Sequence, residues 1–379
     1  MIPATSVAKL QNALPFWMSL GLIPLSLLGA AQGGWYLILV PLYALVLTSL
    51  LDWLTGLNLE NADTETPEPG LHWYRLITLI WFPLQIVMQF GLIWYATQAD
   101  HLATWEKLAL FYGVGVMSGG IGINYAHELM HQKNALERWL GDLLMAAVLY
   151  GHFRSEHLLV HHRYVGTPRD PVTAHYNEGF HRFFPRVLRQ CLTSAWAAEA
   201  AMLARKGLGP FHASNPFWRY AALQGAMLLA ALLIGGLPGL GLFLFQALIA
   251  VWYLELTNYV EHYGLTRKYL GDGSYEPVRP HHSWNADHRM TSWQFINLQR
   301  HSDHHTKPAR RYPLLQTYPE AQAPQLPFGY TAMGFVAMVP PVWRRLMNPK
   351  VRKWRADHYP EITDWGPYKT GQHPVPVIR

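Results

Sequence analysis

The stretch LALFYGVGVMSGGIGINYAHELMH, residues 108–131, determines the class of fold. It contains no Asp, Glu, Lys or Arg before Glu128, and a helix of roughly 20 apolar residues crosses the hydrocarbon core of a bilayer. Gly115 and Gly119 have the GxxxG spacing that allows helices to pack closely in lipid. The stretch therefore predicts a membrane span that ends in a histidine pair, His127 and His131.

Further apolar stretches extend this prediction along the chain. Half of the 379 residues are hydrophobic and only 14% are charged, against about 25% charged residues in an average soluble protein. One cysteine, Cys191, excludes an intrachain disulfide scaffold. We expect an all-α integral membrane protein, a single domain over residues 1–379. Its six transmembrane helices are predicted at about 13–31, 35–55, 75–97, 108–128, 217–236 and 238–259.

The distribution of basic residues predicts the orientation of the chain. Of the 30 Lys and Arg residues, 10 lie in residues 127–215 and 16 lie in residues 262–379. Cytoplasmic connections are enriched in Lys and Arg, so we expect both segments, and both termini, in the cytoplasm. These segments are predicted to form a helical, histidine-rich cap. The net charge of +6 follows from this topology and does not indicate nucleic-acid binding.

Histidine is unusually frequent in the two cytoplasmic segments and is patterned there. Eighteen of the 20 histidines lie in them or at their membrane margins. Residues three or four apart share one face of a helix, so each cluster can direct at least two imidazoles at one point. The clusters are HxxxH (His127, His131), HxxxHH (His157, His161, His162) and HxxHH (His301, His304, His305).

These clusters predict a metal site. Polar side chains beside a membrane span are costly unless they are paired or functional, and adjacent imidazoles depress one another's protonation.

Residues 127–131, HELMH, formally match the H-E-x-x-H motif in which Glu is the general base of a zinc protease. A catalytic zinc needs only three protein ligands. Eight imidazoles are enough for two ions, and iron that activates oxygen suits such ligands better.

The clusters resemble those of the integral-membrane di-iron fatty acid desaturase and hydroxylase superfamily. Four further motifs are similar to those of its alkane 1-monooxygenases, the AlkB family: TPRDP (167–171), NYVEHYGL (258–265), PHHSWN (280–285) and LQRHSDHH (298–305). The matching motifs extend over about residues 124–317, more than half of the chain.

The resemblance implies a centre of two non-haem iron ions and a set of residues around it. It adds His262 to the predicted ligands, which are His127, His131, His157, His161, His162, His262, His301, His304 and His305. Ligating imidazoles usually donate their second N–H to a carboxylate or a carbonyl. The predicted supporting residues are Glu128, Glu156, Asp170, Glu261, His281, His282 and Asp303.

The resemblance also implies an activity and its partners. The expected reaction converts medium- and long-chain n-alkanes and O2 into 1-alkanols in the inner membrane of a bacterium. The chain lacks cysteine pairs, a flavin motif and a G-x-G-x-x-G motif in a suitable context, so electrons must come from a donor outside these residues, either a separate chain or a segment beyond Arg379. In the family this is rubredoxin, reduced by an NADH-dependent reductase. A candidate docking face comprises Arg310, Arg311, Arg344, Arg345, Lys350, Arg352 and Lys353.

Two alternatives remain open from the sequence. Within the superfamily, the chain could be a fatty-acyl desaturase or another hydroxylase, for example of aromatic side chains. From a different class, HELMH leaves an intramembrane zinc metalloprotease as a hypothesis.

Overall fold

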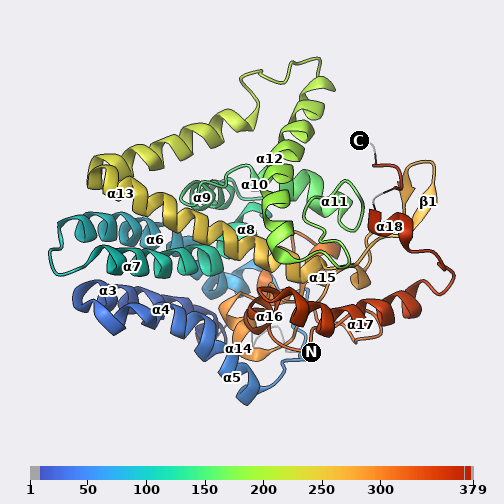
Figure 1. Ribbon diagram of the computed structural model, residues 1–379, viewed down its shortest axis with the longest axis horizontal. Coiled ribbons are helices and arrows are strands. Elements are labelled where there is room, and N and C mark those ends of the chain that lie inside the picture. Colours follow the sequence, from blue (N-terminus) through green and yellow to red (C-terminus); the bar gives the residue numbers. More distant parts are fainter. Residues whose placement is uncertain (1–8, 371, 377–379) are drawn as a thin grey trace.

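The long apolar helices lie side by side and the shorter helices gather at one end of them (Figure 1). This arrangement is that of a computed structural model, which describes residues 9–370 and 372–376. In Figure 1 the helices α3 (Leu22–Gln32), α4 (Leu39–Pro41), α6 (His72–Gln98), α7 (Thr104–Met117) and α13 (Pro216–His262) extend to the left. The short helices α14 (Arg289–Gln294) and α16 (Tyr330–Ala337) lie near the centre, with α17 (Pro340–His358) and α18 (Gly366–Thr370) to the right.

The first two long helices form a hairpin that turns at Gly33. The first comprises α2 (Leu10–Ala13), η1 (Leu14–Gly21) and α3 (Leu22–Gln32). The second comprises η2 (Gly34–Ile38), α4 (Leu39–Pro41), η3 (Leu42–Leu47) and α5 (Thr48–Thr55). Gly33 has φ 64°, a left-handed conformation that glycine adopts without steric cost. The Glu106 carboxylate accepts hydrogen bonds from the Gly34 and Ala103 N–H groups at 2.7 and 2.8 Å, and so joins this turn to the long helix that begins at Thr104.

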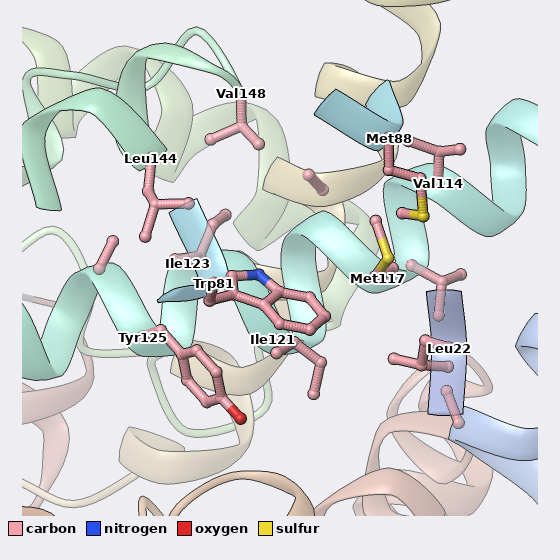
Figure 2. Packing of buried hydrophobic residues seen from close by; sticks show 14 of the residues in the cluster. Leu22, Trp81, Met88, Val114, Met117, Ile121, Ile123, Tyr125, Leu144 and Val148 are labelled. Carbon is pink, nitrogen blue, oxygen red and sulfur yellow. The ribbon is translucent and has the colours of Figure 1, made fainter. Parts of the chain in front are cut away.

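The next two long helices enclose much of the apolar core. One is η4 (Glu68–Leu71) with α6 (His72–Gln98), and the other runs through α7 (Thr104–Met117), η5 (Ser118–Ile123) and α8 (Asn124–Met130). Figure 2 shows Trp81 of α6 beside Ile121 and Tyr125; its ring meets the Tyr125 ring edge-on at 5.5 Å. The Trp81 N–H donates to Gln85 at 2.7 Å, so no donor on this ring is left unpaired.

The GxxxG pair lies where two helices approach closely. A methyl group on Gly115 would lie 2.6 Å from Ile249, and one on Gly119 would lie 2.7 Å from the Ala250 carbonyl oxygen. Both neighbours belong to α13 (Pro216–His262). Close packing at this pair was predicted from its spacing, and the structure confirms it.

α13 is a helix of 47 residues that turns back on itself at Gly236, where φ is 61° and ψ is −156°. Near its start, the Arg219 guanidinium lies over the Trp139 ring of α9 (Ala135–Ala146), in the cap. At the turn, Gly235 lies against Ile93 and Thr97, at the opposite end of α6 from the cap. The second half returns and brings its last residue, His262, to the other histidines.

Within the described residues, five helices are long and apolar enough to cross a membrane. They are Leu10–Gln32, Gly34–Thr55, Glu68–Gln98, Thr104–Met130 and Pro216–His262. The chain is therefore a mostly helical membrane protein. The first four contain the predicted spans, and the fifth contains both of the stretches predicted separately at 217–236 and 238–259.

The cap is built from short helices and one β-hairpin. Strands β1 (Tyr269–Gly271) and β2 (Ser274–Tyr275) pair antiparallel, so the expectation of an all-α chain was wrong by one small hairpin. Positive φ angles at Gly271, Asp272 and Gly273 make its tight turn. The helices are α9 (Ala135–Ala146), α10 (Phe153–Glu156), η6 (His157–His161), α11 (His162–Tyr164), α12 (Phe180–Ala204), η7 (Pro280–His282), α14 (Arg289–Gln294), α15 (His301–Thr306), η8 (Tyr312–Leu314), α16 (Tyr330–Ala337), α17 (Pro340–His358) and α18 (Gly366–Thr370).

Two buried charged side chains attach the cap to the long helices. Asp52, near the end of α5, accepts from the N–H groups of Met290 and Thr291 at 2.7 and 3.0 Å. Arg300, directly before α15, donates to the carbonyl oxygens of Asn58 and Glu60 at 3.0 and 2.9 Å. These bonds fix α14 and α15 against the ends of the first helical hairpin.

Candidate metal centre

The nine predicted histidines come together in two groups at the cap end of the long helices. In each group, the nitrogens that could bind an ion lie within 4.8 Å of one another. Seven of the nine side chains are buried, and His131 and His162 are half-buried. The first group is His127, His131, His157, His162 and His304; the second is His161, His262, His301 and His305.

The Nε2 atoms of the first group point toward one another. His157 Nε2 lies 3.0 Å from His131 Nε2 and 2.9 Å from His162 Nε2. His304 Nε2 lies 3.0 Å from His162 Nε2. The fifth ring, His127, lies with its centroid 4.4 Å from that of His304. Lone pairs that converge at these distances are a ligand set for a cation.

The second group is smaller and adjoins the first. His301 Nε2 lies 3.1 Å from His262 Nε2 and 3.0 Å from His305 Nε2. The ring centroids of His162 and His305 are only 4.6 Å apart, although the two rings belong to different groups. The site thus offers two neighbouring positions for ions, with five and four imidazoles.

Helix geometry determines which histidines of a cluster share a group. His127 and His131, four residues apart, join the same group, as do His301 and His305. In HxxxHH the pair is His157 with His162, five residues apart, because η6 is a π-helix with i→i+5 hydrogen bonds. The sequence predicted two converging imidazoles in this cluster, and α-helical spacing implies His157 with His161. In the structure the converging pair is His157 with His162.

Two of the seven predicted supporting residues contact the imidazoles through their carboxylates. Asp170 lies with Oδ2 3.1 Å from His161 Nδ1, and it also accepts from Thr173 at 2.7 Å. Glu261 lies with Oε1 3.3 Å from His301 Nδ1. The bond between His161 and Asp170 orients a ligating ring and makes it more basic, whereas Glu261 Oε1 and His301 Nδ1 lie close together without forming a hydrogen bond.

Glu128 and Asp303 are directed elsewhere. Glu128 accepts from Gln132 at 3.0 Å and lies 3.8 Å from Arg311. Asp303 holds Arg310 through two hydrogen bonds, at 2.8 and 2.6 Å. These are the ion pairs with neighbouring arginines that a carboxylate near a basic loop commonly forms.

Glu156 precedes His157 and is fully buried. Neither of its carboxylate oxygens has a hydrogen-bond partner among the described residues. Burial, and then the negative charges of Asp170 and Glu255, raise the pKa of Glu156 well above its usual range.

His281 and His282 lie outside both groups. Their Nε2 atoms contact the Tyr359 hydroxyl at 3.0 and 2.8 Å, and Tyr359 donates to Glu276. The Arg279 N–H donates to His282 Nδ1 at 2.9 Å, so in a neutral ring the proton is on Nε2 and that atom has no lone pair for an ion. The side chains of this cluster join the 280–285 loop to the end of α17.

The electrostatic environment keeps six of the imidazoles neutral, the form that binds metals. Burial, with added repulsion from neighbouring imidazoles, lowers the pKa of six rings outside the long helices well below the usual value: His131, His157, His162, His301, His304 and His305. Burial alone would raise the pKa of Asp170, but its interaction with His161 and the hydrogen bonds from His161 and Thr173 outweigh it, so that pKa is lowered. Neutral rings beside an ionised carboxylate fit a bound cation.

The sequence interpretation missed Glu255. This buried residue of α13 accepts hydrogen bonds from Tyr150 at 2.8 Å and from Asn258 at 3.0 Å. The signal was available, because an acidic residue inside a membrane span is by default a candidate for function.

One cavity reaches the histidines, and a second, larger cavity adjoins it. The inner cavity, about 40 Å³, is lined by His127 and His157 of the first group and His301 of the second. The outer cavity, about 330 Å³, is lined mainly by apolar and aromatic side chains of α13 and α16, among them Trp252 and Phe335. The outer cavity has no histidine in its lining.

Comparison with known proteins assigns the chain to a family. The fatty acid desaturase family matches residues 102–337, more than half of the chain. The chain therefore belongs to this family. Membership of the family and the two histidine groups together indicate a metal site.

Within this family the chain belongs to the alkane 1-monooxygenases. It is 36% identical to alkane 1-monooxygenase 2 of Pseudomonas aeruginosa, over 94% of this chain and 93% of that protein. It is 38% identical to alkane 1-monooxygenase 1 of the same organism, over 83% and 82% of the two chains. A more distant relative is the hydroxylase component of the xylene/toluene monooxygenase of Pseudomonas putida, 30% identical over 72% of each chain.

Proposed function

We propose that this chain is a non-haem di-iron monooxygenase that hydroxylates the terminal methyl group of medium- and long-chain n-alkanes to 1-alkanols. The first histidine group would hold one iron and the second group the other, within a single membrane-embedded domain. One observation carries the proposal: nine imidazoles converge in two adjoining groups on the wall of a cavity.

The iron ions would supply the redox chemistry, and the protein would supply position. When bound, two iron ions activate O2 so that one oxygen atom enters a carbon–hydrogen bond and the other leaves as water. Asp170 would orient His161 through its Nδ1 atom, and Glu261 lies 3.3 Å from His301 Nδ1. The apolar outer cavity would bind the hydrocarbon and exclude water, and alkanes already favour the bilayer by about 0.8 kcal/mol per CH2.

Electrons would come from rubredoxin, which an NADH-dependent reductase reduces. The predicted docking face is narrower in the structure, since Arg310 and Arg311 form internal ion pairs with Asp303 and Glu137. Arg345, Arg352 and Lys353 on α17 remain exposed, although Lys353 forms a surface ion pair with Asp357 at 2.7 Å. A basic surface of this kind attracts an acidic carrier and raises its rate of association.

We further propose six membrane crossings in a bacterial inner membrane, with the histidines and both termini in the cytoplasm. α13 starts at the cap, turns at Gly236 beside the far end of α6 and returns, which supports two crossings by this helix. Trp35, Trp94 and Trp105 are exposed at the far end of the long helices, by 85%, 59% and 62%. Such a belt is typical of a membrane interface.

The alternatives are less well supported. As a zinc protease, the chain would need Glu128 to face the ion, whereas this carboxylate faces Gln132 and Arg311. A hydroxylase of aromatic side chains is suggested by the xylene/toluene relative, but that relative matches less of the chain, at lower identity, than the alkane 1-monooxygenases do.

The direct test is turnover of the purified protein in lipid nanodiscs. Iron-loaded protein, supplied with rubredoxin, its reductase, NADH and O2, should convert n-octane to 1-octanol, and the His262→Ala variant should not. A reduced, iron-loaded protein that leaves octane unchanged but introduces double bonds into a fatty-acyl substrate would overturn the proposal in favour of a desaturase.

A further inference from the structure

The inner and outer cavities share part of their walls. Thr257, Phe295 and Tyr330 line both. The inner cavity, at about 40 Å³, is far smaller than the outer one, at about 330 Å³. These three side chains thus stand between a chamber large enough for a hydrocarbon body and a space large enough only for a small end group.

An unusual turn holds Phe295 at this boundary. Phe295 follows α14, and the next two residues, Ile296 and Asn297, have φ angles of 46° and 59°. A positive φ is a genuine outlier for a β-branched residue such as Ile296, and strained backbone of this kind is maintained by its surroundings and is concentrated at functional sites. The Asn124 amide, three residues before His127, donates to the Phe295 carbonyl oxygen at 2.6 Å.

The partners of Phe295 are also fixed. Tyr330 donates from its hydroxyl to the Trp284 carbonyl oxygen at 3.1 Å, and its N–H donates to Gln299 at 3.1 Å. Gly120, in the π-helical segment η5, also lines the inner cavity. A methyl group there would lie 3.6 Å from Cε1 of Phe295, so the ring edge faces a wall without a side chain.

We propose that Phe295, together with Gly120, Thr257 and Tyr330, forms a neck that determines which carbon of the hydrocarbon reaches the histidines. The neck admits the end of an unbranched chain and keeps the remaining carbons in the outer cavity. The inner cavity therefore presents the terminal methyl group to the side of the site lined by His127, His157 and His301. This inference rests on the proposed alkane hydroxylation and assigns its regioselectivity to particular side chains.

The test compares two substitutions of phenylalanine by alanine. Phe295→Ala removes the neck, whereas Phe335→Ala widens only the outer cavity, since Phe335 lines that cavity and not the inner one. With n-octane, we expect Phe295→Ala to increase the fraction of 2-octanol at least about tenfold, the scale on which apolar pockets discriminate single methylene groups. Phe335→Ala should keep the product distribution of the unmodified protein, and Phe295→Leu should give an intermediate one.

A second variant closes the neck and has a readout that does not depend on turnover. Gly120→Val should abolish octane hydroxylation. In the same variant, 1-bromooctane should still quench the fluorescence of Trp252, which lines the outer cavity. The Trp252→Phe protein gives the fluorescence of the other tryptophans as the baseline. Unchanged 1-octanol selectivity in Phe295→Ala, or loss of quenching in Gly120→Val with the iron content retained, would overturn the neck. Failure of the unmodified, iron-loaded protein to make any octanol would instead refute the proposed function.

Discussion

Asp170→Asn removes one negative charge from the histidine site and almost no volume. In the structure, Asp170 Oδ2 lies 3.1 Å from His161 Nδ1 and accepts from Thr173 at 2.7 Å, while Oδ1 accepts from the Val172 N–H at 3.1 Å. An asparagine can keep the bond from Val172. Its NH2 group would then face two donors, the His161 ring N–H and the Thr173 hydroxyl.

The expected loss is in metal affinity more than in folding. Removing a carboxylate that supports a ligating histidine typically weakens metal binding 10- to 100-fold, which corresponds to about 1.4–2.8 kcal/mol. His161 belongs to the four-histidine group, so this group should release its ion first. Competition of the loaded protein with a graded series of chelators, followed by elemental analysis, measures the change.

The matched control is Asp287→Asn. Asp287 is also a buried acid; it accepts from Thr317 at 2.5 Å and lies 3.8 Å from Arg300, and within the described part of the chain it contacts no histidine of either group. We expect this variant to retain metal as the unmodified protein does. Equal retention by Asp170→Asn and the control would refute the claim that Asp170 supports a metal ligand.

Three further results are expected. Glu128→Gln should retain both the metal and the hydroxylase activity, since this carboxylate contacts Gln132; loss of activity with the metal retained would revive the protease-like role of Glu128. Gly115→Ala should destabilise the protein in detergent by about 1–3 kcal/mol through overpacking against Ile249, whereas Gly91→Ala, with no neighbour within 4 Å, should not; equal melting temperatures would contradict the close packing. The free energy of unfolding of the metal-free protein should fall as the pH drops below about 6.5. Histidines in the unfolded chain bind protons in this range, whereas the buried histidines of the folded protein do not. Each such histidine lowers the free energy of unfolding by up to about 1.4 kcal/mol per pH unit. Equal unfolding midpoints at pH 7.5 and pH 5.5 would show that the rings are not protected from protons.

Much of this architecture could be predicted from the sequence because it depends on local patterns. Apolar length alone placed the first four spans, and the GxxxG spacing indicated the close approach of two helices. The histidine clusters indicated a metal site without any knowledge of the fold. The return of α13 at Gly236 follows from the break between two apolar stretches that the sequence also shows.

The remaining features depend on contacts that sequence spacing does not encode. The π-helical turn at η6 pairs His157 with His162, whereas α-helical spacing favours His161. Proximity to a cluster in sequence did not show where a carboxylate points: Asp170 contacts an imidazole, while Asp303 contacts Arg310.

The neck and the buried acid of α13 were also beyond the sequence patterns. Phe295 acquires its place from two left-handed residues and from a bond to Asn124 on another helix, and neither feature has a sequence signature. Glu255 was identifiable as an acid in an apolar span, but its partner Tyr150 could be found only in three dimensions.

The central claim is that the two histidine groups hold two iron ions. The most direct test is elemental analysis of the purified protein in mild detergent, with the metal content expressed per chain. The account predicts close to two irons per chain, and about one in a variant that combines His301→Ala with His305→Ala in the second group. One zinc per chain with no iron, persisting after reconstitution with ferrous iron, would contradict it.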